Sequence, residues 1–176
     1  MELKTERLLL RPARLTDKDV YREMRNSEYV MKYNAMAPIT EEAVEVQLKK
    51  DMVSGRAFYL ERKFTGTLAG AVWLAGDSLR WQVPALTLEY FLGEKFAGQG
   101  LMTEALGAVL SYGFSTTEAQ LISARTFAEN KASQRVLEKL GFQREGVLRR
   151  AVKGYGGVVF DDVLFSLLRE EWEAVQ

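Results

Sequence analysis

Tyr90-Phe91-Leu92-Gly93-Glu94-Lys95-Phe96-Ala97-Gly98-Gln99-Gly100-Leu101-Met102-Thr103-Glu104-Ala105 is a glycine-punctuated segment in the middle of the chain. The apolar run 85–92 predicts a strand that ends at Gly93, and a helical pattern begins after Gly100. Glycines let a backbone approach a ligand closely, and the first amides of a helix have no partners of their own. The helix adds roughly half a positive charge at that end. The segment therefore predicts an anion site for a phosphate or pyrophosphate.

Other glycine-rich phosphate motifs fit this segment less well. The dinucleotide fingerprint requires a third glycine where Thr103 stands, and Glu118 precedes the next predicted strand instead of ending it. A P-loop requires lysine at the position of Gln99. These residues alone also allow a second interpretation, namely a structural glycine turn that binds no ligand.

The composition is that of one globular domain, residues 1–176. The hydrophobic fraction is 47%, the charged fraction is 27%, and the formal net charge is zero. A zero charge argues against broad capture of nucleic acid, which requires an excess of basic side chains. The chain has no cysteine and no histidine, which excludes disulfides, structural zinc sites and a Ser-His-Asp triad. No clustered acidic motif suggests a metal site of another kind.

Neither a secretion signal nor a membrane span is expected. Glu2, Lys4, Glu6 and Arg7 interrupt any apolar segment at the N-terminus. No uninterrupted apolar run approaches transmembrane length. These features favour a cytoplasmic protein.

The predicted elements alternate between strands and helices. Thr16 and Thr40 are predicted N-caps, and Gly55 is a predicted helix stop. The mixed order predicts an α/β (α+β) sheet with helices on both faces. The predicted strands span 5–12, 58–63, 68–74, 85–92, 121–127, 147–152 and 158–168, and the predicted helices span 17–26, 41–53, 101–116 and 130–140.

A second segment after the next predicted strand reads Asn130-Lys131-Ala132-Ser133-Gln134-Arg135-Val136-Leu137-Glu138-Lys139-Leu140-Gly141-Phe142. Together with the glycine turn it resembles the Gcn5-related N-acetyltransferase (GNAT) superfamily. Residues 95–100 are similar to that family's acyl-CoA motif, Arg/Gln-x-x-Gly-x-Gly/Ala, with Lys95 replacing the usual Arg or Gln. The opening Thr5-Glu6-Arg7-Leu8-Leu9-Leu10-Arg11-Pro12 resembles the RimJ/RimL branch, named for ribosomal-protein N-terminal acetyltransferases.

The resemblance implies a central mixed, mostly antiparallel sheet with a splayed parallel strand pair and helices on both faces. The splayed strands are then 85–92 and 121–127, and acetyl-CoA enters between them as the acetyl donor. A bulge near Phe91 and Leu92 would free backbone groups to pair with the pantetheine amides. Asn130 is also explained as a helix N-cap. The residues that the resemblance assigns to the cofactor are Phe91, Leu92, Lys95, Gly98, Gln99, Gly100, Leu101, Met102, Asn130 and Ser133.

The resemblance implies direct attack of a primary amine on the thioester. A covalent route through cysteine is excluded, which predicts a ternary complex. The family often uses a tyrosine as the acid for the departing thiolate, and Leu137 stands at that place. Ser133 is the implied substitute in the RimL-like branch.

The general base is less well defined by the sequence. Glu89 lies on the same predicted strand face as Phe91, although an ordinary exposed strand glutamate explains it as well. Glu145 and Tyr155 are lesser candidates, and a site without a strong base stays open. An α-amine has a pKa of about 7.7–8.0 and a lysine side chain about 10.4, so a site without histidine favours an α-amine.

The resemblance implies an acceptor groove under the connection 29–40, which contains Tyr29, Tyr33, Asn34 and Met36. Trp73 and Trp81 are further aromatic candidates for its wall, although ordinary core packing explains the aromatic residues at least as well. Ribosomal-protein N-termini, spermidine, aminoglycosides and amino acids are acceptors of similar-looking proteins. Zero net charge disfavours the polycations, which prefer acidic grooves. The apolar run 158–168 would allow a homodimer through a sheet edge. A CoA-binding sensor or interaction module without turnover is the alternative function.

Overall fold

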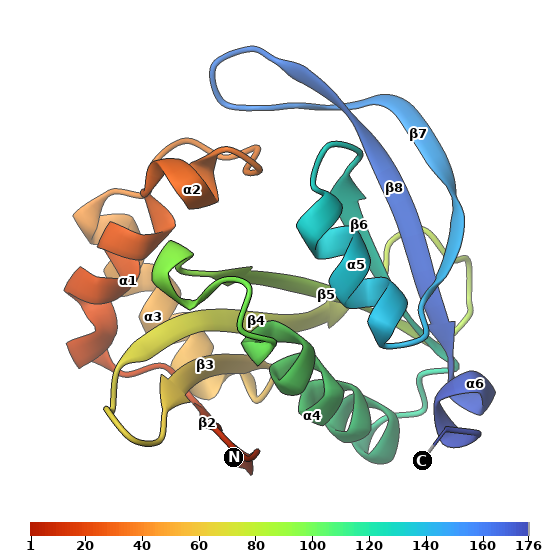
Figure 1. The fold of residues 1–176 in the computed structure, drawn as a ribbon, viewed down its shortest axis with the longest axis horizontal. Coiled ribbons are helices and arrows are strands. Elements are labelled where there is room, and N and C mark those ends of the chain that lie inside the picture. Colours follow the sequence, from red (N-terminus) through yellow and green to blue (C-terminus); the bar gives the residue numbers. More distant parts are fainter. Residues whose placement is uncertain (176) are drawn as a thin grey trace.

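The computed structural model describes residues 1–175, which form an eight-stranded sheet with helices on both faces (Figure 1). The strand order is β1-β2-β3-β4-β5-β6-β8-β7, and β5–β6 is the parallel pair in an otherwise antiparallel sheet. The strands are β1 Leu3–Lys4, β2 Leu8–Arg11, β3 Ala57–Arg62, β4 Leu68–Gly76, β5 Ala85–Leu92, β6 Leu121–Phe127, β7 Gln143–Lys153 and β8 Val159–Leu168. The α-helices are α1 Lys18–Arg25, α2 Glu28–Met31, α3 Glu41–Ser54, α4 Leu101–Thr116, α5 Lys131–Lys139 and α6 Arg169–Glu173, and two short 3-10 helices are η1 Leu15–Asp17 and η2 Glu94–Phe96.

The two parallel strands diverge toward their C-terminal ends. Their pairing runs from Ala85↔Leu121 to Leu88↔Ala124, although β5 continues to Leu92 and β6 to Phe127. Figure 1 shows the gap opening between β5 and β6, with η2 and the start of α4 beyond β5 and α5 beside β6. The splayed pair implied by the sequence is therefore confirmed.

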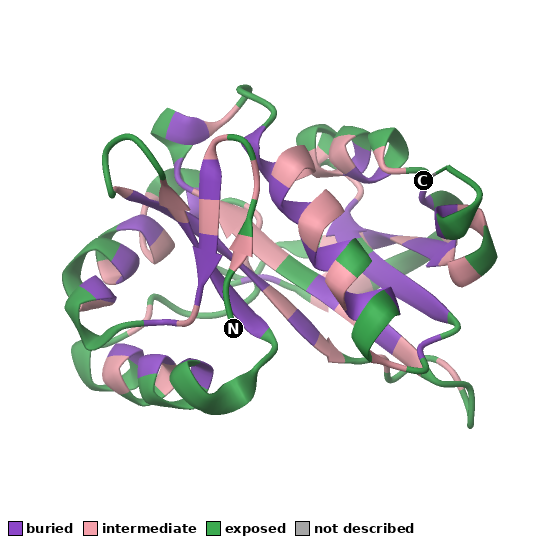
Figure 2. Ribbon diagram, turned by 90° about the horizontal axis from the view of Figure 1, so that it is seen from below, coloured by how far each residue is buried: buried purple, intermediate pink, exposed green. Residues whose placement is uncertain are grey.

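Successive side chains along each strand point to opposite faces of the sheet, and each face is covered by a layer of helices. Phe58, Val72 and Tyr90 stand opposite one another in register and face α4, whose Tyr112 ring lies 5.3 Å from that of Phe58. The other face packs against α1 and α3, where Tyr21 stacks on Tyr59 at 5.6 Å. Buried positions follow the strands between these layers, and the outward helix faces are exposed (Figure 2).

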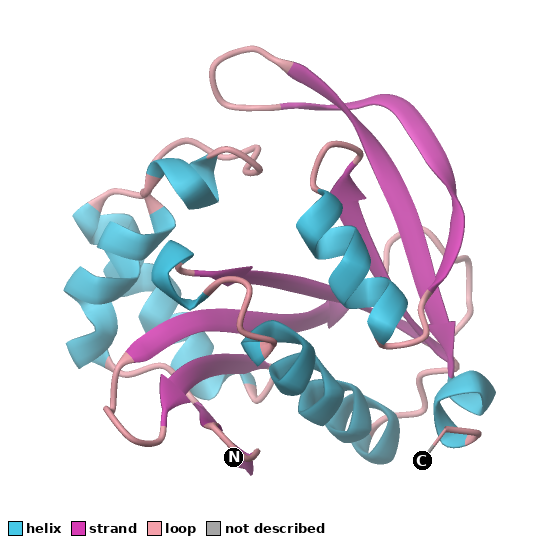
Figure 3. Cartoon of the chain, in the orientation of Figure 1, coloured by secondary structure: helices cyan, strands magenta, loops and turns pink. Residues whose placement is uncertain are grey.

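The predicted elements with strong local signals are confirmed at or near their predicted bounds (Figure 3). Thr40 Oγ1 accepts a hydrogen bond from the Ala43 amide at 3.2 Å, and Gly55 ends α3 at φ +64°. Thr16 is not a helix cap, because it lies inside η1 and α1 begins at Lys18. The short elements β1, α2, η1, η2 and α6 were not predicted, since so few residues carry little periodicity.

Two expectations about the sheet are wrong. No bulge occurs near Phe91, because β4 and β5 stay in register from Gly76↔Leu86 to Gly70↔Leu92, and Gly70 leaves room for the Phe91 carbonyl. The apolar strand β8 does not lie at a sheet edge, since β6 and β7 flank it on both sides. The argument for a dimer through that strand is therefore lost.

Membrane insertion through a helix finds no support in the described residues. None of the helices within 1–175 combines the length and the apolar character that crossing a bilayer requires.

Candidate active site

The glycine turn presents a row of unpaired amides to a cleft. Gly98 and Gly100 adopt φ values of +71° and +76°, and α4 begins at the next residue. Within residues 1–175, the amides from Gly98 to Thr103 donate no hydrogen bond. The next amide, that of Glu104, donates to the Gly100 carbonyl at 3.1 Å. A Cβ on Gly98 would meet no atom within 4 Å, so the space beside the turn is open. Free amides at a helix N-terminus beside open space suit a pyrophosphate.

The N-terminal hairpin fixes the orientation of this turn. Arg7 Nη1 donates to the Gln99 carbonyl at 2.8 Å, and Arg7 Nε donates to Glu104 Oε2 at 2.6 Å. Thr5 Oγ1 and the Arg7 amide both donate to Glu104 Oε1. Burial opposes ionisation of Glu104, but these hydrogen bonds and the Arg7 charge outweigh it and lower the pKa of the carboxyl. Thr5 and Arg7 therefore hold the glycine turn and the first turn of α4 in place.

The free edge of β5 continues the site from the turn. Residues 89–92 do not pair with β6, so their backbone groups on that side face the gap. Phe91 and Leu92 both line the cleft there. An extended chain with amide groups can pair with such an edge as an added strand.

Tyr90 and Ser133 meet across the gap between β5 and α5. Tyr90 Oη and Ser133 Oγ lie 2.6 Å apart, and burial raises the pKa of Tyr90 to about 12. Asn130 Oδ1 accepts from the Ser133 amide at 3.1 Å, so the N-cap role of Asn130 is confirmed and holds the start of α5. The sequence predicted Ser133 but missed Tyr90, because the strand register that brings the two together is not visible locally.

The other face of the sheet carries Glu89 beside an aromatic wall. Glu89 stands opposite Trp73 in register, and Phe91 lies on the same face with its ring 5.9 Å from that of Trp73. Asp51 is buried below the wall, where it accepts hydrogen bonds from Trp73 Nε1 and Tyr59 Oη at 2.9 Å each. These neutral donors hold the carboxylate in place.

One cleft of about 1560 Å³ joins these features. Tyr33 closes it on one side, since its hydroxyl donates to the Glu129 carbonyl at 3.3 Å. Two predicted cofactor residues, Lys95 and Gln99, lie outside the lining; Gln99 Nε2 instead donates to the Lys95 carbonyl at 2.9 Å. The predicted residues that line the cleft are Tyr29, Tyr33, Asn34, Met36, Trp73, Glu89, Phe91, Leu92, Gly98, Gly100, Leu101, Met102, Asn130 and Ser133.

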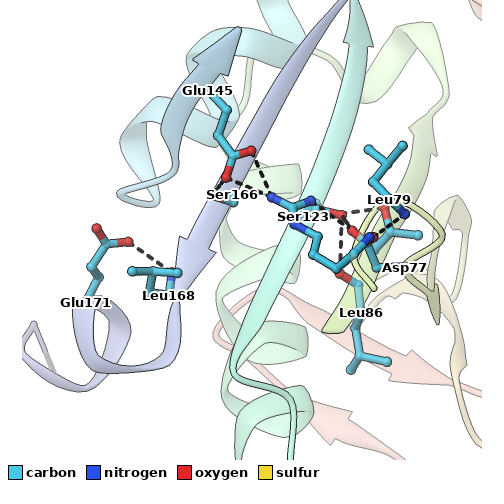
Figure 4. A network of polar contacts seen from close by, with 10 residues as sticks. Asp77, Leu79, Leu86, Ser123, Glu145, Ser166, Leu168 and Glu171 are labelled. Carbon is cyan, nitrogen blue, oxygen red and sulfur yellow. Dashed lines mark hydrogen bonds and ion pairs between the residues drawn. The ribbon is translucent and has the colours of Figure 1, made fainter. Parts of the chain in front are cut away.

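The lesser base candidates lie outside the cleft lining. Glu145 accepts two hydrogen bonds from Arg80 Nη2, at 2.7 and 2.9 Å, and another from Ser166 (Figure 4). Tyr155 is exposed in the turn between β7 and β8, and Trp81 is exposed between β4 and β5. Glu145 and Tyr155 are therefore not placed to act as bases in the cleft, and Trp81 does not belong to its wall.

Residues 7–143 match the family model described as an acetyltransferase (GNAT) domain, so the chain belongs to the GNAT acetyltransferase family. The chain is an N-acetyltransferase, as its relatives are. An uncharacterized N-acetyltransferase p20 of Bacillus licheniformis is 31% identical over 176 residues, which cover 97% of both chains. A [ribosomal protein uS5]-alanine N-acetyltransferase of Escherichia coli is 35% identical over 94 residues, 53% of this chain and 48% of that one.

Solved structures share the same fold. A GNAT-family acetyltransferase from Bacillus anthracis superimposes with a TM-score of 0.85 at 27% identity, covering 97% of this chain and 100% of that one. Mycobacterium smegmatis RimJ, solved in complex with CoA-disulfide, reaches 0.80 at 22% identity, covering 97% of this chain and 88% of that one. The second likeness establishes the fold alone.

Proposed function

We propose that this enzyme transfers the acetyl group of acetyl-CoA directly to a primary amine, and that the α-amine of a protein N-terminus or of a small molecule is the acceptor. The observation that carries the proposal is the row of unpaired amides at 98–103, which opens into the same cleft as the Tyr90–Ser133 pair. An anion site and a proton donor in one cleft fit an acyl-CoA and its departing thiolate.

The residues present fit the cofactor. The amides of the turn and of the first turn of α4 would hold the pyrophosphate, and the free edge of β5 at Phe91 and Leu92 would pair with the pantetheine amides. When bound, acetyl-CoA supplies the activated acetyl group. Lys131, Arg135 and Lys139 also line the cleft from α5 and add positive charge beside an anionic ligand.

The strand β5 separates an acid from a base. Because successive side chains point to opposite faces, Glu89 faces the α1/α3 side and Tyr90 faces α5. Glu89 would accept the proton that the attacking amine loses as its nitrogen bonds to the acetyl carbon. Ser133 would donate to the sulfur as the carbon–sulfur bond breaks, and Tyr90 would resupply the proton through the 2.6 Å contact.

The absence of histidine favours an acceptor that is easy to deprotonate. About a tenth of an α-amine is neutral at pH 7, since its pKa is about 7.7–8.0, whereas a lysine side chain at about 10.4 needs some 3.5 kcal/mol more help. Robust turnover of lysine side chains without turnover of α-amines would contradict this acceptor class.

The first test is calorimetric titration with acetyl-CoA, with NAD and ATP as controls, followed by thiol release with a panel of amines. Selective binding of acetyl-CoA together with α-amine turnover supports the proposal. Binding without turnover of any amine favours a CoA sensor instead, and absence of binding removes the cofactor assignment.

A further inference from the structure

Arg25 is a half-buried guanidinium in the cleft without an acidic partner. It is the last residue of α1 and lines the cleft, and its side-chain hydrogen bond runs from Nη1 to the sulfur of Met31 at 3.4 Å. Within residues 1–175 no carboxylate lies within ion-pair distance of it. By contrast, Arg22 of the same helix lies 3.8 Å from Glu41 and does not line the cleft. A partly desolvated cation with only a thioether as partner is costly unless a ligand supplies the anion.

Contacts place Arg25 on the acceptor side of the cleft. Tyr21 and Arg25 are four residues apart on α1 and therefore share one helix face. The Tyr21 ring meets the Phe91 ring at 5.7 Å, and Phe91 lies on the same face of β5 as Glu89. Arg25 is thus on the same side of the sheet as the candidate base Glu89, and on the side opposite to Ser133.

The charges of the cleft agree with an anionic ligand group on this side. Seven basic and three acidic side chains line the cleft, and three of the basic ones stand on α5. The other four, Arg25, Lys32, Lys50 and Arg56, come from the part of the chain that runs from α1 to β3. One of the three acids, Asp51, is buried and engaged by neutral donors. A polycationic acceptor would meet repulsion here.

We propose that Arg25 binds a carboxylate of the acceptor, so that the substrate class is an α-amine with a carboxylate close by. The inference rests on the proposed acetyl transfer to an amine. The guanidinium offers two parallel N–H donors to a carboxylate, while the amine reaches toward Glu89 across Phe91. Arg25 then selects the acceptor from the side of the sheet opposite to the Tyr90–Ser133 pair.

The test is an NMR titration of the protein, with and without CoA, using acetylated product analogues in matched pairs. N-acetyl-L-alanine and N-acetyl-L-alaninamide differ in the free carboxylate, and N-acetyl-Ala-Glu-amide and N-acetyl-Ala-Gln-amide differ in a side-chain carboxylate. We expect the charged member of at least one pair to bind about tenfold or more tightly, which is the usual scale for a hydrogen bond to a charged group. The pair that discriminates tells a free amino acid from an acidic peptide N-terminus.

Variants assign the effect to this residue. Arg25→Gln is expected to abolish the preference, Arg25→Lys to keep part of it, and Arg22→Gln on the same helix to leave it unchanged. Equal binding within both pairs, absence of binding of all four analogues, or a preference that survives Arg25→Gln overturns the inference. CoA affinity, measured in the same samples, reports separately on the cofactor assignment, because within residues 1–175 no hydrogen bond or ion pair joins Arg25 to the glycine turn.

Discussion

Arg7 Nη1 donates a hydrogen bond of 2.8 Å to the backbone carbonyl of Gln99, in the middle of the glycine turn. The C=O and N–H of one trans peptide unit point in opposite directions, so a carbonyl held toward Arg7 directs the Gly100 amide away from it. A residue near the chain start thereby orients an amide of a turn that lies over ninety residues later. This contact gives the Thr-x-Arg motif a physical role at the proposed cofactor site.

Replacing Arg7 by methionine is expected to weaken acetyl-CoA binding by about tenfold, because the charged hydrogen bonds to the turn and to Glu104 are lost. The turnover number at saturating cofactor should change little. Calorimetry and steady-state kinetics measure the two quantities. Arg14→Met, which removes an exposed partner of Glu61 away from the turn, is the control; equal effects of both changes would contradict this role of Arg7.

Gly98→Glu is expected to lower acetyl-CoA affinity by roughly 100-fold, or about 2.7 kcal/mol, because it puts a carboxylate where phosphate is proposed to bind. The positive φ makes any side chain there strained, so the change needs a matched control. Gly66→Glu provides it, since Gly66 has a φ of +65° and also meets no atom within 4 Å. Similar thermal unfolding of the two variants with unchanged affinity for Gly98→Glu would remove the phosphate site.

Ser133→Ala and Tyr90→Phe are each expected to lower kcat by about 100-fold, the usual scale for a positioned acid. The double variant should lose little more than either single one, because the two hydroxyls act as one pair. Tyr112→Phe, which removes an exposed hydroxyl bonded to the Gly55 carbonyl, is the control. Fully additive losses would show that the hydroxyls act independently.

The pKa of Tyr90, raised to about 12 by burial, also has a kinetic consequence. The phenol stays almost fully protonated up to about pH 10, so kcat should not fall between pH 8 and about 10, where an ordinary tyrosine begins to ionise. A pH profile of kcat with a tyrosine-like loss near pH 10 that vanishes in Tyr90→Phe would contradict this prediction.

Glu89→Gln is expected to lower kcat/KM by about 10- to 100-fold at pH 7 if the carboxylate is the base. The deficit should shrink toward pH 9, because an α-amine with a pKa of about 7.7–8.0 is then largely neutral without help. Thr87→Val, at an earlier position on the same strand face and outside the cleft lining, is the control. A deficit that is the same at both pH values would indicate a binding role.

Glu104 predicts acid sensitivity of the turn. Its pKa is lowered, so its contribution to stability is complete above the ordinary value of 4.5 and is lost as the pH falls through the lower folded value. Unfolding and acetyl-CoA affinity followed down to pH 3 should show this loss in the natural protein. The Glu104→Gln variant should have a lower stability and a lower acetyl-CoA affinity at pH 7, and both quantities should change less as the pH falls to 3. An acid dependence equal to that of the natural protein would refute this role of Glu104.

Local sequence signals were enough for the elements that carry the proposed cofactor site. The bounds of β5, α4 and β6 agree with the prediction, because an apolar run, paired glycines and a helical period act within a few residues of one another. Asn130 likewise caps its own helix. Motifs of this kind also fixed the family, since the turn at 95–100 and the segment 130–142 keep their order and spacing.

Long-range packing decided what the local signals left open. Strand register brought Tyr90 to Ser133, the hairpin brought Arg7 to Gln99, and α1 carried Arg25 to the acceptor side. The same packing paired Glu145 with Arg80 and placed β8 between β6 and β7 inside the sheet. Such contacts join residues that are distant in sequence, and they depend on the folded sheet. The sequence by itself therefore determined the class of protein and the glycine turn, whereas the tertiary structure determined the partners of each reactive side chain.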